Sequence, residues 1–288
     1  MKIYDCFTFY NEFDLLELRL AELYDVVDHF VIVEANQTFT NRPKPFNFEL
    51  NQTRYQQYLD KITYIKVEDM PGDADPWVNE AHQRNQIMQG CVDAAPEDII
   101  IVSDCDELLR ADAVDYIRNS EQSLFALRMP LYNFKFNYMR SSTGIYDVWA
   151  MAARRELFAD IDPDALRGMR FNFFGSPSQY SNEGCEVVEH TGWHFGYLGN
   201  NDYLKDKAQS FSHQSVNNPE FLSQIDIDSS IAAKTDWGHN NVDRYEILDL
   251  DSYFPLSLTN NQEQYKQFIL DNSGVKSLDL LPEYTYNQ

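Results

Sequence analysis

The first 110 residues alternate short apolar runs with segments of helical periodicity. The apolar and β-branched runs that predict strands cover residues 3–10, 30–33, 62–67 and 99–102. The segments that predict helices between them cover residues 14–24, 49–58 and 77–92. Apolar strands that alternate with helices are typical of a mostly parallel, Rossmann-like α/β sheet with helices on both faces. In such a sheet, ligands bind beyond the carboxyl ends of the strands.

After residue 110 the pattern changes. Helices are predicted over 112–119 and 201–213, and long antiparallel strands over 124–138 and 149–158. Residues 167–185 are rich in Gly, Ser, Pro and Asn and predict a loop, whereas 187–198 predicts a strand interrupted at Gly192 and Gly196. We expect one domain over 1–215, with halves of about 1–110 and 111–215, and a helical or irregular extension over 216–288 packed on it.

Composition narrows the possible partners. The net charge of −23 and the pI of about 4.4 argue against binding to nucleic acid or to anionic lipid. An anionic nucleotide would need local Lys, Arg or a divalent cation to offset this field. Four scattered cysteines without a CxxC pair argue against a zinc ribbon and a disulfide framework, and predict buried reduced thiols.

The N-terminus enters directly into strand-like sequence. It carries no signal-peptide pattern, and no apolar run approaches the roughly 18 residues that span a bilayer. We therefore expect a soluble cytoplasmic protein without a transmembrane segment.

Two carboxylates, Asp104 and Asp106, directly follow the apolar run over 99–102. In an extended chain, residues two apart project to the same side. Carboxylates that face one crevice repel each other unless a cation lies between them, and hard oxygen ligands suit Mg²⁺ or Mn²⁺. Such an ion would bind a nucleotide diphosphate and neutralise a leaving group. The alternative is a solvated acidic turn.

Three other features offer candidate side chains. His194, between Gly192 and Gly196, could complete a metal site, or it could be a hydrogen-bonded structural histidine. Lys205 and Lys207 could hold phosphate, or they could lie on a solvated helix face. Arg84 could pair with Glu80 one helical turn away, or it could reach the phosphates or brace the aspartates.

Several segments of the first half together form a specific pattern, namely 11–16 (NEFDLL), 22–28 (ELYDVVD), 33–36 (VEAN), 39–40 and 43–46. In these segments the chain resembles glycosyltransferase family 17. The resemblance continues through Trp77, Arg84, residues 104–107, the Gly-Trp-His at 192–194 and residues 205–210, and so covers roughly 3–215.

This resemblance implies a GT-A type fold with an antiparallel extension on the acceptor side. It also implies a UDP-sugar donor (UDP-N-acetylglucosamine in known members), Mn²⁺ or Mg²⁺, a glycan acceptor, and inversion at the anomeric carbon. Asp106 would bind the metal, Asp104 would contact metal or ribose, and His194 would be a further metal ligand. The strand-end residues Asn11, Glu34 and Asn36 would lie near the nucleoside, and the halves of 1–215 would bind donor and acceptor. Unlike the animal members, the chain shows no membrane anchor or stem, which argues against a Golgi role.

An inverting transfer also needs a general base for the acceptor hydroxyl. Asp147, Glu189 and Glu107 are the candidates, and Glu107 could instead brace the metal ligands. Two other classes of function stay open. A metal-dependent phosphohydrolase would need more clustered Asp and His ligands. A non-catalytic sugar-binding module would use the abundant aromatic residues, 14% of the chain.

Overall fold

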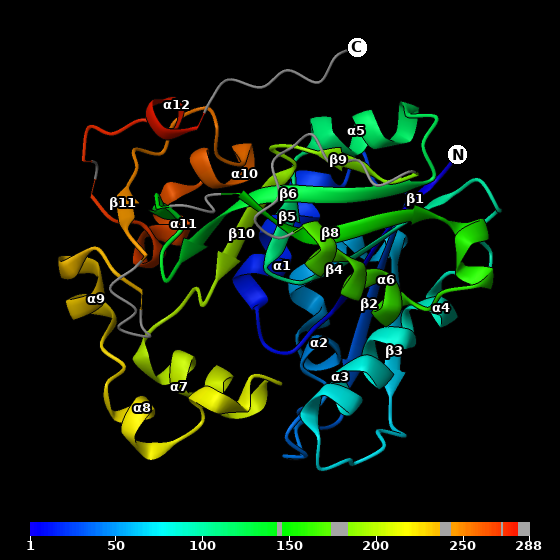
Figure 1. Cartoon of the computed structure of the whole chain (residues 1–288), viewed down its shortest axis with the longest axis horizontal. Coiled ribbons are helices and arrows are strands. Elements are labelled where there is room, and N and C mark those ends of the chain that lie inside the picture. The colour runs from blue at the N-terminus through cyan, green and yellow to red at the C-terminus, as the bar shows by residue number, and fades with distance from the viewer. Residues whose placement is uncertain (143–145, 174–183, 237–242, 272, 282–288) are drawn as a thin grey trace.

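The computed structural model describes residues 1–142, 146–173, 184–236, 243–271 and 273–281. Its first half alternates strands and helices as the hydrophobic pattern predicts (Figure 1). The elements of this half are β1 (Ile3–Thr8), α1 (Phe13–Leu23), β2 (His29–Ala35), α2 (Asn47–Asn51), the 3₁₀ helix η1 (Gln52–Lys61), β3 (Ile62–Val67), α3 (Pro76–Asn85), α4 (Ile87–Gly90) and β4 (Ile99–Asp104).

The middle of the chain contributes most of the antiparallel strands. These elements are β5 (Glu107–Leu109), α5 (Ala111–Asn119), β6 (Leu124–Asn133), β7 (Tyr138–Arg140), β8 (Tyr146–Arg154), η2 (Arg155–Ala159), α6 (Pro163–Gly168), η3 (Met169–Phe173), β9 (Glu186–Val188) and β10 (Gly192–Gly196). The strand predicted over 124–138 is thus two strands, and the one predicted over 187–198 is β9 and β10.

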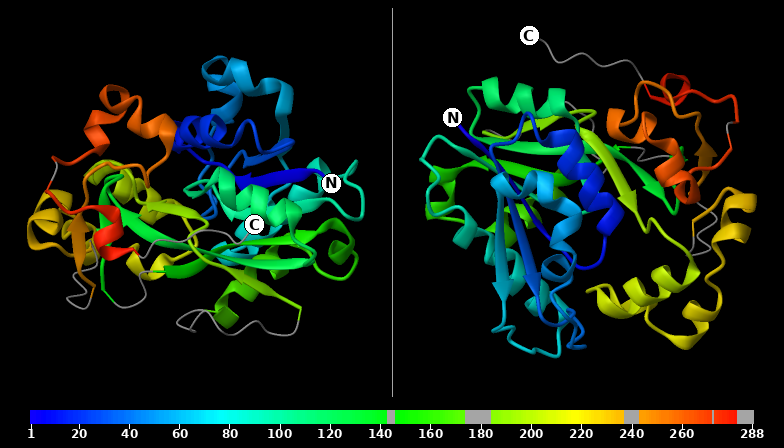
Figure 2. Two further views of the ribbon diagram at one scale, coloured as in Figure 1. Left: turned by 90° about the horizontal axis from the view of Figure 1, so that it is seen from above. Right: turned by 180° about the vertical axis from the view of Figure 1, so that it is seen from behind.

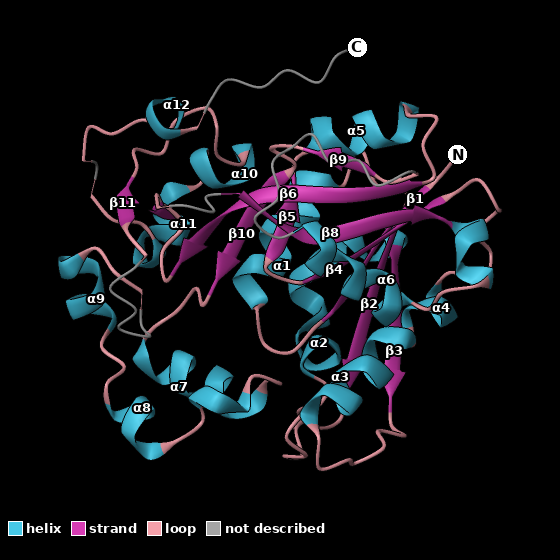
Figure 3. Cartoon of the chain, viewed as in Figure 1, coloured by secondary structure: helices cyan, strands magenta, loops and turns pink. Residues whose placement is uncertain are grey.

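The last third is mainly helical, as Figure 3 shows. Its elements are α7 (Asn201–Ser210), η4 (Gln214–Val216), α8 (Pro219–Ser223), α9 (Ile227–Ala233), β11 (Tyr245–Ile247), α10 (Leu256–Thr259), α11 (Gln262–Tyr265), η5 (Lys266–Phe268) and α12 (Ser277–Leu280). Strand β11 pairs with β7, so this segment extends the sheet at its edge.

Within the described residues, the strands form one sheet of 11 strands with the main order β11-β7-β6-β8-β4-β1-β2-β3. Strands β4, β1, β2 and β3 are mutually parallel, and β8 continues the sheet antiparallel to β4. Strand β10 lies between β5 and β6 off this path. The predicted α/β fold, a parallel sheet with an antiparallel extension, is therefore confirmed.

Helices cover both faces of the parallel strands (Figure 2). On one face, Phe7, Ile32 and Ile101 pack in a core with leucines of α1 and with Val114 and Ile117 of α5. On the other face, alternate strand residues pack with Ile87 of α4, Leu166 of α6 and Cys91. Strands buried on both faces explain their wholly apolar sequence.

The four cysteines are free thiols and are buried, as their scattered spacing predicts. Among the described residues, none of the helices combines the length and the apolar character that a bilayer crossing requires.

The loop expected over residues 167–185 is wrong at its start. Residues 167–173, expected in a loop, belong to α6 and η3. Helix α6 begins with Asp162, whose side chain accepts a hydrogen bond from the Ala165 N–H at 2.7 Å, followed by Pro163 at the first helical position. This is a standard N-terminal signal that the glycine- and serine-rich composition downstream obscured. Residues 174–183 lie outside the described part of the chain.

Candidate active site

The site lies where the parallel sheet changes direction. From β1 the chain moves outward through β2 and β3 and then returns to β4 on the other side of β1. The crevice beyond the carboxyl ends of β1 and β4 is therefore open to a ligand. A cavity of about 530 Å³ lies there, lined by Tyr10 and Glu12 after β1 and by Asp104 and Asp106 after β4. This volume suits a small-molecule ligand.

Asp106 lies in the turn between β4 and β5 and is 7% exposed. Its Oδ2 accepts a hydrogen bond from Lys207 Nζ at 2.7 Å, and its Oδ1 lies 3.7 Å from His194 Nε2. Burial opposes ionisation, but Lys207 and then His194 hold the pKa of Asp106 below its usual value. Asp106 is therefore a carboxylate at neutral pH, with one oxygen paired to Lys207 and the other facing His194.

His194 reaches the site from β10, nearly ninety residues later in the chain. Its ring packs edge-on against Trp149, with centroids 4.2 Å apart, and its buried Nδ1 has no hydrogen-bond partner among the described residues. Burial lowers the pKa of His194 to about 4, although Asp106 opposes the shift. The imidazole is therefore neutral near pH 7, which is the form that binds metal ions.

These residues fit a divalent cation. Asp106, Glu107 and His194 each offer one ligand atom, and the three atoms lie within 4.8 Å of one another. Two ligands of one octahedral ion with bonds of about 2.1 Å stand about 3 to 4 Å apart, and the Asp106–His194 separation falls in this range. The mixed oxygen and nitrogen donor set suits Mn²⁺.

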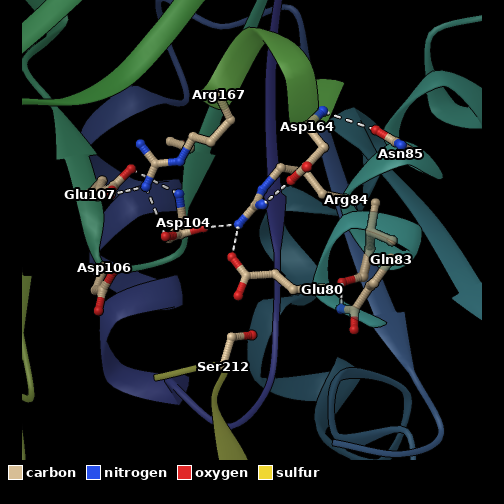
Figure 4. Close-up of polar contacts among 12 residues, drawn as sticks. Glu80, Gln83, Arg84, Asn85, Asp104, Asp106, Glu107, Asp164, Arg167 and Ser212 are labelled. Carbon is tan, nitrogen blue, oxygen red and sulfur yellow. Dashed lines mark hydrogen bonds and ion pairs between the residues drawn. The ribbon is translucent and has the colours of Figure 1, made fainter. Parts of the chain in front are cut away.

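Asp104 faces a different set of partners (Figure 4). Its Oδ1 lies 3.2 Å from Arg84 Nη2, and its Oδ2 accepts a hydrogen bond from Arg167 Nη2 at 2.8 Å. Burial alone would raise its pKa, but Arg167 and Arg84 hold the pKa of Asp104 well below its usual range. Arg84 also pairs with Glu80 and Asp164. Asp104 therefore joins α3 and α6 at the cavity wall.

Glu107 is almost completely buried, at 1% exposure, although it lies at the cavity wall. One carboxylate oxygen accepts a hydrogen bond from the Asp104 N–H at 2.9 Å, and the other pairs with Arg167. Burial raises the pKa of Glu107 to about 7, against the opposing effect of Arg167. Glu107 thus closes the turn that carries Asp106.

Arg19 of α1 binds the backbone of the same turn. Its side chain is fully buried and pairs with Asp5, and Nη2 donates to Ser103 Oγ at 2.6 Å. Its Nη1 donates to the backbone carbonyls of Asp104 at 2.9 Å and Glu107 at 3.0 Å. The sequence analysis missed Arg19, because a single arginine on the apolar face of a helix carries no local signal of its partners.

Of the two lysines predicted to hold phosphate, only Lys207 lines the cavity. Residues two apart on an α-helix point about 200° away from each other, so α7 cannot direct both Lys205 and Lys207 to one site. Asp106 raises the pKa of Lys207 well above its usual value, although burial opposes its charge. Helix α7 is fixed to the opposite wall, because Asp206 accepts hydrogen bonds from the Tyr10 hydroxyl at 2.7 Å and from Arg42 at 2.8 Å.

The strand-end residues predicted near the nucleoside lie behind the wall. Neither Asn11, Glu34 nor Asn36 lines the cavity, whereas Tyr10, Glu12 and other residues beside them do. Glu34 is fully buried and its carboxylate accepts hydrogen bonds from Lys44 Nζ and the Asn47 N–H, both at 2.6 Å. Glu34 therefore shapes the loop before α2.

Two of the three candidate bases lie outside the lining. Asp147 pairs with Arg140 at 2.6 Å, and Glu189 pairs with Arg128 at 2.9 Å. The lining also contains residues that the sequence analysis did not single out, namely Glu12, Lys44, Trp149, Arg167, Arg170, Tyr197, Asp236 and Asp243. Most come from segments whose approach to β4 depends on the tertiary fold.

Comparison with known proteins identifies the family of this chain. The sequence profile of glycosyltransferase family 17 matches residues 1–155, more than half of the 288 residues. The chain belongs to glycosyltransferase family 17. The matched range of this family 17 chain includes both aspartates and Glu107 but ends before Arg167 and His194.

Curated relatives match the family 17 chain over a longer range. The β-1,4-mannosyl-glycoprotein 4-β-N-acetylglucosaminyltransferase of Rattus norvegicus is 25% identical, over 91% of this chain and 53% of its own length. The human protein of that name is 28% identical, over 64% of this chain and 38% of its own. The family 17 chain thus spans about half the length of the curated relatives it matches, or less.

Solved structures overlap this family 17 fold partially. The galactosyltransferase LgtC, in complex with donor and acceptor sugar analogs, has a TM-score of 0.35 and 10% identity, over 65% of this chain and 73% of its own. The inositol-1-phosphate CTP transferase from T. maritima has a TM-score of 0.37 and 8% identity, over 65% of this chain and 84% of its own.

Proposed function

We propose that this family 17 chain transfers N-acetylglucosamine from a UDP-sugar to a hydroxyl group of a glycan, with inversion and with Mn²⁺ or Mg²⁺. The observation that carries the proposal is the meeting of Asp106 and His194 in a cavity at the crevice of the parallel sheet. The names of the relatives support N-acetylglucosamine as the sugar and suggest a β-mannosyl glycan as the first acceptor to test.

In this proposal, Asp106 and His194 would hold the cation, with Glu107 close by. The chemistry that a bound divalent cation would supply there is positive charge for a departing diphosphate. Lys207 neutralises the second oxygen of Asp106 and keeps its carboxylate ionised. Arg19 and Glu107 keep the turn in place before substrate arrives, because they bind its backbone.

The binding step is tested by calorimetry of a panel of UDP-sugars with and without Mn²⁺. We expect binding that requires the metal in the wild type, and a loss of affinity of at least about tenfold in Asp106→Asn. Asp112→Asn is the matched control, since Asp112 is an exposed carboxylate outside the cavity that pairs with Arg110. No binding of any UDP-sugar, or binding indifferent to Asp106→Asn, would overturn the proposal.

The general base of the proposed transfer has to lie at the cavity. Asp147 and Glu189 are not in the lining, and Glu107 already binds Arg167 and the Asp104 backbone. The lining carboxylates beside β7 and β11 are Asp236 and Asp243, with Tyr245 of β11 next to them. We propose Asp236 or Asp243 as the base, because both carboxylates line the cavity on this side.

Transfer kinetics of Asp236→Asn and Asp243→Asn test this placement. Loss of a general base is expected to lower kcat by about 10² to 10⁴ and to leave the KM for the UDP-sugar nearly unchanged. If both variants keep the wild-type kcat, the base lies elsewhere.

A further inference from the structure

Positive charge is concentrated in the cavity of this acidic chain. Six of its 23 Lys and Arg residues line the cavity described above. They are Lys44, Arg84, Arg140, Arg167, Arg170 and Lys207. In a chain with a net charge of −23, such a concentration needs either internal acidic partners or an anionic ligand.

Five of these six cations have acidic partners, Arg167 among them. Lys44 pairs with Glu34 at 2.6 Å, Arg140 with Asp147 at 2.6 Å and Lys207 with Asp106 at 2.7 Å, and Arg84 pairs with Glu80, Asp104 and Asp164. These contacts bind protein elements to one another and leave little charge for a ligand. Arg167 and Arg170 differ from the other four in what their guanidinium groups leave unused.

Arg170 is a half-buried cation that has no acidic partner among the described residues. Among the residues that the structure describes, its guanidinium makes no hydrogen bond or ion pair, and it packs 4.7 Å from the centroid of the Phe171 ring. Burial, and next the neighbouring Arg167, lower the pKa of Arg170 to about 10. It therefore stays charged at neutral pH, beside a second cation.

Only one of the three guanidinium nitrogens of Arg167, Nη2, has partners among the described residues. Its Nη2 pairs with Asp104 and Glu107, as Figure 4 shows. Its Nε and Nη1 are buried and have no hydrogen-bond partner in the described part of the chain, although the side chain is only 2% exposed. Arg167 is the arginine in the described part of the chain with two such donors, and an anionic ligand is one partner that could supply their acceptors.

We propose that Arg167 and Arg170 form the subsite that binds the diphosphate of the nucleotide sugar, beside the Asp106–His194 pair. This inference rests on the proposed function. Two guanidinium groups with unused N–H donors match the several oxygens of a diphosphate, whereas one carboxylate would occupy only one of them. Asp104 then has a positioning role, because it holds Arg167 from one side and Arg84 from the other.

The test compares ligands that differ only in phosphate. UDP and uridine are titrated by calorimetry into the whole chain with Mn²⁺, for the wild type, Arg170→Gln and Arg54→Gln. Arg54 is the matched control, because it pairs with Asp14 and Glu17 outside the cavity and its loss changes the net charge equally. We expect Arg170→Gln to weaken UDP binding about tenfold to a hundredfold and to leave uridine binding unchanged. Arg54→Gln is expected to change neither.

A second variant tests the role of the buried Arg167. Arg167→Lys keeps the charge but loses the planar fork, so it is expected to weaken UDP binding at least as much as Arg170→Gln while uridine still binds. Uridine binding in this variant shows that the site is still folded.

The outcomes separate the two proposals. If Arg170→Gln binds UDP as tightly as the wild type, or loses uridine and UDP affinity in parallel, the diphosphate subsite is wrong. The proposed function survives that result as long as the wild type uses UDP-sugars. If the wild type binds no UDP at all, the proposed function fails and the subsite fails with it.

Discussion

At the scale of single residues, the two aspartates after β4 have different partners. The sequence argument assumed an extended chain, in which both would face one side. The strand ends at Asp104, however, and Asp106 lies in the turn that follows. Asp104 therefore contacts two arginines, whereas Asp106 contacts Lys207 and lies beside His194. The roles assigned to both aspartates stay predictions until a metal or nucleotide is measured.

A second residue-scale consequence concerns pH and His190. This side chain is 7% exposed, and its backbone φ of 55° lies in the left-handed region. Burial, and next Arg110, lower the pKa of His190 to about 4 from 6.5. Between pH 4 and pH 6.5, His190 therefore binds a proton in the unfolded chain but stays unprotonated in the folded chain. The free energy of unfolding consequently falls as pH falls from about 6.5 to about 4.

The variant His190→Asn is expected to remove this contribution, because asparagine does not titrate and tolerates a left-handed backbone. At pH 4.5 the neutral His190 lowers the free energy of unfolding of the wild type by about 2 to 3 kcal/mol relative to pH 7. Urea denaturation at pH 7 and pH 4.5 measures it. If the variant loses as much stability between these pH values as the wild type does, His190 is not held neutral.

At the scale of elements, β10 brings His194 to the site. It pairs with β5 on one side and with β6 on the other, and His194 is in register with Glu107. Gly192 permits this approach, since a Cβ there would lie 2.0 Å from the Leu108 carbonyl oxygen. The glycines that predicted an interrupted strand are thus its first and last residues.

Gly192→Ala is accordingly expected to separate β10 from β5. The free energy of unfolding should fall by about 1 to 3 kcal/mol, because the added methyl group meets backbone that cannot move aside cheaply. Gly168→Ala is the control, since a Cβ at Gly168 would meet nothing within 4 Å, and it should change stability by less than about 0.5 kcal/mol. Chemical denaturation compares them. Equal stability of both variants would contradict the role given to Gly192.

At the scale of the whole molecule, the part of the fold that could be predicted is the part that the local pattern of apolar and polar residues determines. The apolar runs indicate β1 to β4, and the crevice follows from their order. The choice between neighbouring residues is different. Lys207 rather than Lys205 lines the cavity, because the phase and position of α7 decide which lysine points inward. Tertiary contacts set that phase, and a single sequence does not record them.

The proposed diphosphate subsite also could not be predicted from local sequence. Arg167 and Arg170 lie in a segment whose composition predicted a loop, and their importance depends on what their neighbours leave unpaired. The resemblance to family 17 could nevertheless be recognised from residues 11–46. A family is recognised from the identity and order of its residues, and this does not require knowing how those residues are arranged in space.

The most direct test of the account is an acceptor-dependent transfer assay on the whole chain. UDP-N-acetylglucosamine, Mn²⁺ and a β-mannosyl glycan are incubated with the wild type, Asp106→Asn and Asp112→Asn, and the glycan is analysed by mass spectrometry. The account predicts one added N-acetylhexosamine with the wild type and Asp112→Asn. It predicts that the product disappears with chelator and falls at least about a hundredfold with Asp106→Asn. Transfer that is indifferent to both changes, or release of UDP at the same rate without any acceptor, would contradict it.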